Sequence, residues 1–314
     1  MKIAIAGAGA MGGRFGYKLV KAGNKDVFFV DRWEANVEAI RSKGLQVDDG
    51  GVHESVEIPV YFPEELADNE LQADLVILFV KAMQLDDMLK SLKPLLGEST
   101  YVLCLLNGIG HESVVERHIP RSRILLGNTM WTAGLEGPGR IKLVGGGSID
   151  LQNLMPEGKD MAIKVAELLT EAGLIAGYSE NVLHMIYKKA CVNGAVNGIC
   201  ALLDCNINTY GSTACAEAIV RAVVGEFIGV AAAEGVDMVA EDMVQNILKS
   251  FAPEAAGLHY PSMHQDLVRN NRLTEIDYIN GVIVQKGLKY GISTPYCSLI
   301  TQLVHCKEEI LGAK

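Results

Sequence analysis

The chain opens on a glycine-rich loop between an apolar segment and a helical pattern. Lys2–Ala6 is expected to form a strand, and Met11–Lys21 is expected to form a helix. The residues that join them fit the spacing G-x-G-x-x-G: Gly7, Ala8, Gly9, Ala10, Met11 and Gly12. In this context the three glycines permit a tight turn, a close approach of backbone to a pyrophosphate, and close packing of helix on strand. Because a helix N-terminus also attracts phosphates, we predict that this loop binds a dinucleotide.

The first half of the chain alternates apolar segments with helical patterns. Strands are expected at Lys2–Ala6, Asp26–Val30, Leu75–Val80, Tyr101–Leu106 and Ile124–Gly127, with helices at Met11–Lys21 and Trp33–Lys43. This alternation predicts a parallel sheet built from β-α-β units, and strands that are apolar throughout predict cover on both faces. Residues 45–62 and 137–151 contain turn glycines, so they are expected to form hairpins or edge strands attached to that sheet.

After about Tyr178 the pattern becomes helical only. Helices are expected at Val182–Ile199, Ala214–Gly235, Val239–Phe251 and Leu273–Tyr290. We therefore predict an α/β fold, in which an N-terminal Rossmann-type doubly wound sheet is followed by an all-α C-terminal domain. Residues 1–178 would bind the dinucleotide, and residues 179–314 would hold the substrate and catalytic groups.

Charge and cysteine content limit the partners that we expect. The formal net charge of −10 disfavours nucleic acid and anionic membranes, because both reward basic surfaces. With neither a spanning apolar stretch nor a signal-peptide pattern recognised, we expect a cytoplasmic protein. The seven cysteines are scattered without metal-ligand spacing, so we expect reduced thiols and no metal site.

Two neighbouring residues give opposite indications about the cofactor. Asp31 follows the second expected strand, 19 residues after Gly12, where a carboxylate binds the ribose hydroxyls of NADH and repels a 2′-phosphate. Arg32 could instead pair with the 2′-phosphate of NADPH, or be a solvated surface arginine. The position of Asp31 favours NADH, while Arg32 leaves NADPH open.

A polar stripe marks the first helix of the second half. Lys189, Asn193 and Asn197 are spaced i, i+4 and i+8, so they share one helix face. Asparagine and glycine are poor interior helix formers, so a helix that carries them is a candidate for presenting polar groups to a ligand. The alternative is a polar stripe that faces solvent.

A second polar cluster spans Tyr260–Gly281. Its functional interpretation places Ser262 and Glu275 at the active site. In the structural alternative, Thr274 caps the following helix, and Glu275 and Asp277 interact with its dipole.

Taken in order, these motifs resemble the ketopantoate reductase (2-dehydropantoate 2-reductase) family over nearly the full length. The matching segments are the loop Gly7–Gly12, Val80–Gln84, Leu106–Gly108, Ala133–Gly139, the Lys189/Asn193/Asn197 stripe, Ser262–Asp266 and Thr274–Gly281. The family architecture, a Rossmann domain followed by a helical domain, agrees with the pattern above. The family also includes D-2-hydroxyacid dehydrogenases of the mandelate type, which use NAD.

The resemblance implies roles for individual residues. Lys189 matches the catalytic lysine, and Glu275 is expected to act beside it and near the cofactor. Asn193, Asn197 and Ser262 match substrate-binding residues. Lys81, Asn107 and Ala133 match positions near the cofactor, and Arg32 matches an arginine that binds a 2′-phosphate.

The expected activity is hydride transfer from NADPH or NADH to the 2-oxo group of a 2-oxo acid. 2-Dehydropantoate is the favoured substrate, and an NAD-dependent D-2-hydroxyacid dehydrogenase is the alternative. The third alternative is a non-catalytic dinucleotide sensor. A homodimer is possible, with the helix at 214–233 packing either in the core or at the interface.

Overall fold

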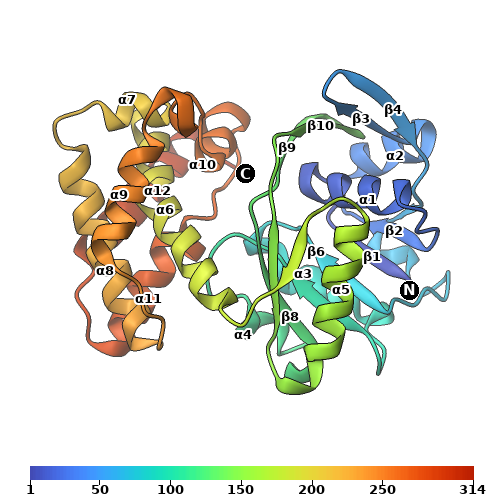
Figure 1. The fold of residues 1–314 in the computed structure, drawn as a ribbon. Helices are drawn as coiled ribbons and strands as arrows, with labels where there is room; N and C mark the ends of the chain where they lie inside the picture. The colour runs from blue at the N-terminus through green and yellow to red at the C-terminus, as the bar shows by residue number, and fades with distance from the viewer. The chain divides into compact units, whose positions relative to one another are not determined.

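The computed structural model describes residues 1–314, and the chain divides into two compact units. The first unit comprises Met1–Leu106 and His111–Val182. The second comprises Leu183–Lys314 and the short segment Asn107–Gly110 (Figure 1). The helices after residue 182 are drawn in yellow to red in Figure 1.

The first unit is built on an eight-stranded sheet with the order β12-β11-β8-β7-β6-β1-β2-β5. Its strands are β1 (Ile3–Ala6), β2 (Val27–Val30), β5 (Val60–Tyr61), β6 (Leu75–Leu78), β7 (Tyr101–Cys104), β8 (Ile124–Thr129), β11 (Ile149–Asn153) and β12 (Ala176–Tyr178). Neighbouring strands pair in parallel except β11, which runs antiparallel to β8. From β1 the strands are added outward in both directions, with β2 and β5 on one side and β6, β7 and β8 on the other, as in a doubly wound sheet.

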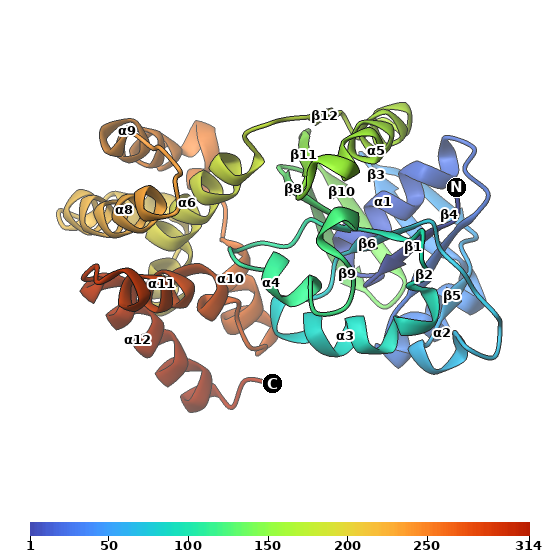
Figure 2. The same cartoon turned by 90° about the horizontal axis from the view of Figure 1, so that it is seen from below.

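Helices cover both faces of this sheet (Figure 2). One face packs against α1 (Ala10–Lys21), α2 (Glu34–Lys43) and α5 (Lys159–Glu171), and the other against α3 (Leu85–Ser91) and α4 (Glu112–Val115). The alternation within β1 shows the two faces, because Ile3 and Ile5 join one cluster of buried side chains while Ala4 and Ala6 join the other. Short 3-10 turns connect the elements: η1 (Pro63–Glu65), η2 (Ala82–Gln84), η3 (Lys93–Leu95), η4 (Arg121–Arg123) and η5 (Pro156–Gly158).

The two expected hairpin regions form a second sheet instead of extending the first. Strands β3 (Leu45–Asp49), β4 (Val52–Val56), β9 (Thr132–Gly137) and β10 (Arg140–Val144) pair in the order β4-β3-β10-β9. The prediction that both regions attach to the main sheet is therefore wrong for the hairpins and correct only for β5 and β11. The physical reason is a shared apolar face: buried Leu45 and Ile141 contact α1 at Gly13, where a side chain would crowd them.

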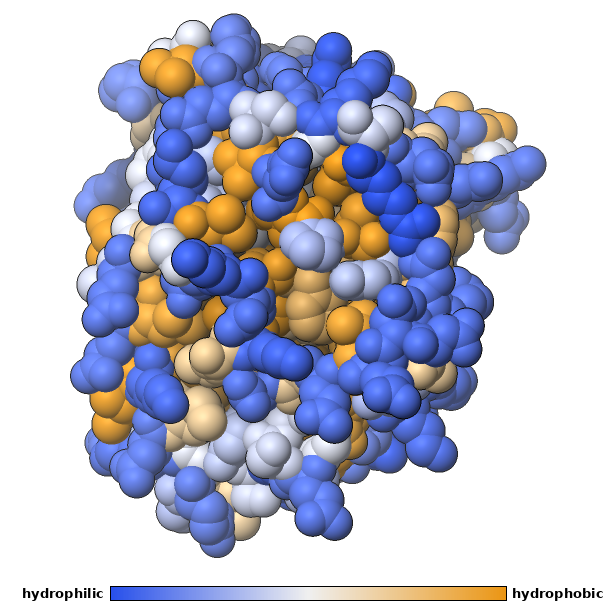
Figure 3. Space-filling view, turned by 90° about the vertical axis from the view of Figure 1, so that its right-hand side faces the viewer, coloured by the Kyte–Doolittle hydropathy of each residue, from blue (hydrophilic) through white to orange (hydrophobic).

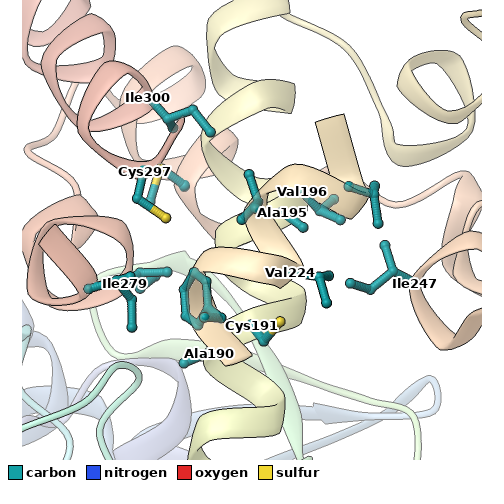
Figure 4. Close-up of a cluster of buried hydrophobic side chains, with 14 of the residues drawn as sticks. Ala190, Cys191, Ala195, Val196, Val224, Ile247, Ile279, Cys297 and Ile300 are labelled. Carbon is teal, nitrogen blue, oxygen red and sulfur yellow. The ribbon is translucent and has the colours of Figure 1, made fainter. Parts of the chain in front are cut away.

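The second unit is helical. It contains α6 (Val182–Leu203), α7 (Ile207–Gly211), α8 (Ala216–Ala233), α9 (Ala240–Ser250), α10 (Ser262–His264), α11 (Val282–Tyr290) and α12 (Pro295–Leu311). Three π-helical turns accompany them: η6 (Pro253–Gly257), η7 (Gln265–Arg269) and η8 (Asp277–Gly281). The core gathers buried side chains from α6, α8, α9, η8 and α12 (Figure 4). The helix expected from Leu273 thus begins later and opens with a π-helical turn.

The surface is mixed in polarity. On the face shown in Figure 3, hydrophilic side chains surround an area where apolar side chains are visible. None of the helices combines the length and apolar character needed to cross a membrane.

All seven cysteines are free thiols; five are buried, and Cys215 and Cys306 are exposed.

Candidate active site

The glycine loop joins β1 to α1 with each glycine in a distinct environment. Gly7 has φ +95°, and a Cβ there would lie 2.8 Å from the backbone carbonyl of Phe79. A Cβ on Gly12 would overlap the carbonyl oxygen of Gly7, so this glycine is needed for close packing of helix on strand. Gly9, by contrast, faces open space, with nothing within 4 Å of a Cβ placed there. The first and third glycines are therefore required by the fold, and the second leaves room for a ligand.

The N-terminus of α1 fits the pyrophosphate of a dinucleotide. No side chain caps this end, and the first turn carries no acidic residue. Its backbone N–H groups therefore have no intrahelical or side-chain acceptor, and the helix dipole adds positive potential. Gly9, Ala10, Met11 and Gly12 are the residues that would hold the phosphates.

Asp31 lies directly after β2 and is bound to the glycine loop. Its Oδ2 accepts a hydrogen bond from the Ala8 backbone N–H at 2.6 Å, and its Oδ1 accepts one from the Trp33 N–H at 2.8 Å. These two bonds fix the carboxylate at the carboxyl end of β2, next to the loop. An acceptor at this place suits the hydroxyls of an adenosine ribose.

Asn36 is a site residue that the sequence analysis missed. Its side chain is fully buried, and its Nδ2 donates to the Ala8 carbonyl at 3.1 Å and to Asp31 Oδ2 at 3.4 Å. Its Oδ1 accepts from the Gly139 N–H at 2.7 Å. The Asn36 amide thus links the glycine loop, the Asp31 carboxylate and the turn of the β9–β10 hairpin. Its only sequence signal is a polar residue among the apolar positions of α2.

Arg32 is bound to α3. Its Nη2 donates to the carbonyl oxygen of Asp87 at 2.7 Å and to the hydroxyl of Ser91 at 2.6 Å. The side chain is exposed. The guanidinium therefore has acceptors within the protein, and it would have to exchange some of them to hold a 2′-phosphate.

Ala133 lies on β9, which buried Arg14 connects to α1. The Arg14 side chain is 3% exposed, donates to the backbone carbonyls of Thr132 and Val144, and lies 4.1 Å from the ring centroid of Trp131. Desolvation by burial lowers the pKa of Arg14, and the nearby Asp49 carboxylate opposes that shift. This arginine, which the sequence analysis also missed, holds Ala133 near the helix that begins at the glycine loop.

Lys81 and Asn107 follow neighbouring strands of the main sheet. Lys81 comes after β6, two residues beyond Phe79, whose backbone contacts Gly7. Asn107 comes after β7, and its segment packs on residue 278: the Ile109 N–H donates to the Tyr278 carbonyl at 3.0 Å. Asn107 and Glu275 therefore belong to the second unit, whereas Lys81 belongs to the first.

Helix α6 carries the polar stripe. Lys189 and Asn193 are half-buried, and Asn197 is 6% exposed. A fully solvent-exposed stripe does not fit this burial, because none of the three side chains is exposed. Such amides and an amine, partly withdrawn from water on one face, are suited to binding oxygen atoms of a polar ligand.

Lys189 and Glu275 interact electrostatically within the second unit. Desolvation by burial lowers the pKa of Lys189 to about 8, and the charge of Glu275 opposes that shift. Glu275 is 7% exposed. A lysine with a pKa near 8 can both carry a proton at neutral pH and release it, which suits a general acid.

The glycines of α6 have a packing role that the sequence analysis attributed to ligand presentation. A Cβ on Gly194 would lie 2.5 Å from the ring of Phe227, and one on Gly198 would lie 2.8 Å from Ile300. Buried Asn280 also donates from Nδ2 to the Gly194 carbonyl at 3.1 Å. Small residues here let α6 approach its neighbours closely, so only the lysine and the amides point to a ligand.

Ser262 and Thr274 lie at element boundaries. Ser262 begins α10, and its side chain is exposed. The hydroxyl of Thr274 accepts from the Ile276 N–H at 3.3 Å, in the manner of a helix cap. The proposed roles of the site residues remain predictions, which the experiments below address.

Comparison with known proteins identifies the family of the chain. The model of the family "Ketopantoate reductase PanE/ApbA" matches residues 3–156, and that of its C-terminal domain matches residues 181–308. A 2-dehydropantoate 2-reductase from Lactococcus lactis is 52% identical over the full length of both chains, and one from Streptococcus pyogenes is 50% identical over 99% of each. A ternary structure of D-mandelate dehydrogenase with NADH and anilino(oxo)acetate is 50% identical over all of both chains, with a TM-score of 0.97.

Proposed function

Since the chain belongs to the ketopantoate reductase family, we propose that it reduces the 2-oxo group of a 2-oxo acid with NAD(P)H, and that 2-dehydropantoate is the substrate. The observation that carries this proposal is Lys189, whose lowered pKa and neighbouring Glu275 provide a proton donor on the polar face of α6. The family relation gives no support to a non-catalytic sensor.

Lys189 and Glu275 have different roles in the proposed reduction. When bound, the nicotinamide supplies the hydride that the carbonyl carbon accepts. Negative charge develops on the carbonyl oxygen, and Lys189 stabilises that charge and donates its proton. Glu275 keeps Lys189 protonated, because a nearby carboxylate raises the pKa of the ammonium group.

Neutral polar side chains, those of Asn193, Asn197 and Ser262, would bind the substrate. Asn193 and Asn197 share the face of Lys189, so their amides would orient the remaining oxygens of the substrate. Ser262 would bind the carboxylate through its hydroxyl, which is exposed at the start of α10.

We propose NADH as the preferred cofactor. The fixed Asp31 carboxylate supports this preference, because it would accept from the ribose hydroxyls and repel a 2′-phosphate. Arg32 is engaged with α3 at Asp87 and Ser91, which weakens its claim to a 2′-phosphate. We expect Asp31→Asn to lower the NADH-over-NADPH ratio of kcat/KM by about tenfold or more, since one charge repulsion is worth roughly 1.4 kcal/mol or more at this range.

Asp31→Asn removes the charge and keeps one acceptor oxygen, which can still bind the Ala8 N–H, although the acceptor for the Trp33 N–H is lost. Arg32→Ala is the matched variant at the neighbouring position. An unchanged ratio in Asp31→Asn, with a fall in NADPH use in Arg32→Ala, would contradict the role of Asp31 and show that Arg32 binds the 2′-phosphate.

The alternative substrate class is the aromatic or branched 2-oxo acid of a D-2-hydroxyacid dehydrogenase. The D-mandelate dehydrogenase structure supports this alternative, because it is 50% identical to the chain, as is the Streptococcus pyogenes reductase. Initial rates on 2-dehydropantoate, phenylglyoxylate and 2-oxoisovalerate, each with NADH and NADPH, distinguish the two. The proposal expects the highest kcat/KM on 2-dehydropantoate with NADH, and a preference for phenylglyoxylate would establish the alternative.

We also propose a homodimer. The helix α8 buries Val220, Val224 and Phe227 in the core, which leaves its inner face unavailable to a partner. A dimeric ketopantoate reductase from Staphylococcus aureus is similar in fold at 20% identity. Light scattering on the protein as it elutes from a size-exclusion column should give twice the chain mass of 33.8 kDa.

A further inference from the structure

Two side chains of α12 hold the segment that carries Glu275. The Glu308 side chain is buried, and its Oε1 accepts a hydrogen bond from the Thr274 backbone N–H at 2.7 Å. Thr274 is the residue directly before Glu275, and both are buried in the second unit. The anchor therefore acts on the backbone one peptide away from the proposed catalytic carboxylate.

His305 extends this anchor to the other side of Glu275. Its Nδ1 lies 2.8 Å from Glu308 Oε2, and its Nε2 lies 3.0 Å from Asp277 Oδ1. Carboxylates only accept hydrogen bonds, so both contacts are satisfied together when both ring nitrogens carry a proton. Burial lowers the pKa of His305, but hydrogen bonds and charge interactions with Glu308 and Asp277 outweigh it, so the net shift is upward.

Glu308 and His305 connect α12 to residues 274–277 at two points. Glu308 is withdrawn from solvent although its hydrogen bonds go to a loop N–H and a half-exposed histidine. A buried carboxylate costs free energy unless it is paired, so this arrangement stabilises a specific conformation of residues 274–277.

We infer that Glu308, with His305, is a positioning residue for the reaction, because it holds the backbone of residues 274–277 and so sets the distance of Glu275 from Lys189. The inference rests on the proposed function for the meaning of Glu275 in turnover. The geometric part stands apart from turnover, because the interaction of Glu275 with Lys189 is a property of the folded chain.

The test measures the pKa of Lys189 directly, by NMR titration of protein labelled at the ε-carbon of lysine, with the signal assigned by its loss in Lys189→Met. Glu275→Gln should lower this pKa, because the carboxylate that raises it is removed. Glu308→Ala should move it in the same direction, toward the Glu275→Gln value. Glu308→Gln keeps an acceptor for the Thr274 N–H, so it should restore a value near that of the wild type.

The matched control is Glu309→Ala, which removes an exposed carboxylate from the next position of α12. It should leave the Lys189 pKa unchanged. In kinetics, Glu308→Ala should lower kcat about tenfold while KM for NADH changes less than twofold, and the alkaline limb of the kcat profile should shift with the NMR value.

A Lys189 pKa in Glu308→Ala equal to that of the wild type would overturn the inference. If Glu308→Ala does not fold, His305→Gln serves instead, because it removes the bridge to Asp277 and should produce a smaller shift in the same direction. Absence of turnover by the wild type on every 2-oxo acid would refute the proposed function, while the NMR titration would still decide whether Glu308 positions Glu275.

Discussion

At the scale of single residues, Lys189 and Asp31 show two ways in which surroundings change a common polar side chain. Lys189 is an ordinary lysine made less basic by burial, and Glu275 limits that change. Asp31 is an ordinary aspartate whose oxygens are oriented by the Ala8 and Trp33 N–H groups. In both cases the surroundings convert a common side chain into one with a defined charge and direction.

The proton carried by Lys189 predicts opposite pH dependences for the two directions of the reaction. Reduction needs the ammonium form, so kcat should fall as pH rises through about 8. Oxidation of the 2-hydroxy acid needs the neutral amine, so its kcat should rise over the same interval. Steady-state profiles in both directions, at saturating cofactor, check the sign.

Removal of the lysine gives a second test at the same residue. Lys189→Ala should lower kcat by about 10²- to 10⁴-fold, the range of a general acid, with NADH binding retained. The control is Lys188→Ala, because Lys188 is the exposed neighbour on the same helix. Wild-type turnover by Lys189→Ala with cofactor still bound would disprove the assignment.

At the scale of elements, the same residue type serves different ends in different places. Gly9 of the dinucleotide loop faces open space, whereas Gly12 packs against the carbonyl of Gly7. Gly194 of α6 meets the ring of Phe227, whereas Gly225 of α8 has nothing within 4 Å of an added Cβ. Spacing in the sequence cannot separate these cases, because the neighbours that decide them come from distant segments.

The glycine loop gives a prediction that separates binding from folding. Gly9→Ala should keep the unfolding temperature of the wild-type apoprotein but bind NADH at least about tenfold more weakly, because its methyl group enters the space left for the pyrophosphate. Gly12→Ala should lose both stability and binding. Thermal unfolding without ligand and fluorescence titration with NADH distinguish the two, and equal behaviour of the variants would contradict the assigned roles.

Helix packing gives a prediction of opposite signs for one substitution. Gly194→Ala should destabilise the protein by about 1–3 kcal/mol, because the added methyl group collides with Phe227 in a packed core. Gly225→Ala should stabilise it by roughly 0.5–1 kcal/mol through helix propensity alone. Urea unfolding of both variants measures the change in the free energy of unfolding. If Gly194→Ala stabilised the protein, the Phe227 ring would have to shift to make room for the added methyl group.

At the scale of the whole molecule, each unit has its own hydrophobic core. The cluster around α6 and α8 contains only residues of the second unit, and the two clusters beside the main sheet contain only residues of the first. The short segment 107–110 belongs to the second unit although it follows a strand of the first sheet. Local packing, not order along the chain, decides where a segment belongs.

Ligand binding to a folded chain predicts a defined gain in stability. NADH at about one hundred times its Kd should raise the free energy of unfolding of the part that binds it by about 2.7 kcal/mol. Calorimetry with and without NADH measures this gain, and Gly9→Ala should reduce it at the same NADH concentration. A wild-type transition that NADH leaves unmoved would contradict dinucleotide binding.

Much of this protein was determined by the sequence itself. The dinucleotide loop, the alternating strands and helices, the change to an all-helical pattern and the Lys189 stripe depend on local periodicity and spacing, which are properties of neighbouring residues. Only the tertiary structure decided that the two hairpin regions form a second sheet, that Asn36 joins the loop to Asp31 and Gly139, and that Glu308 holds the segment of Glu275. The physical reason is that these features arise from hydrogen bonds and packing between residues far apart in the chain, and no local pattern encodes such partners.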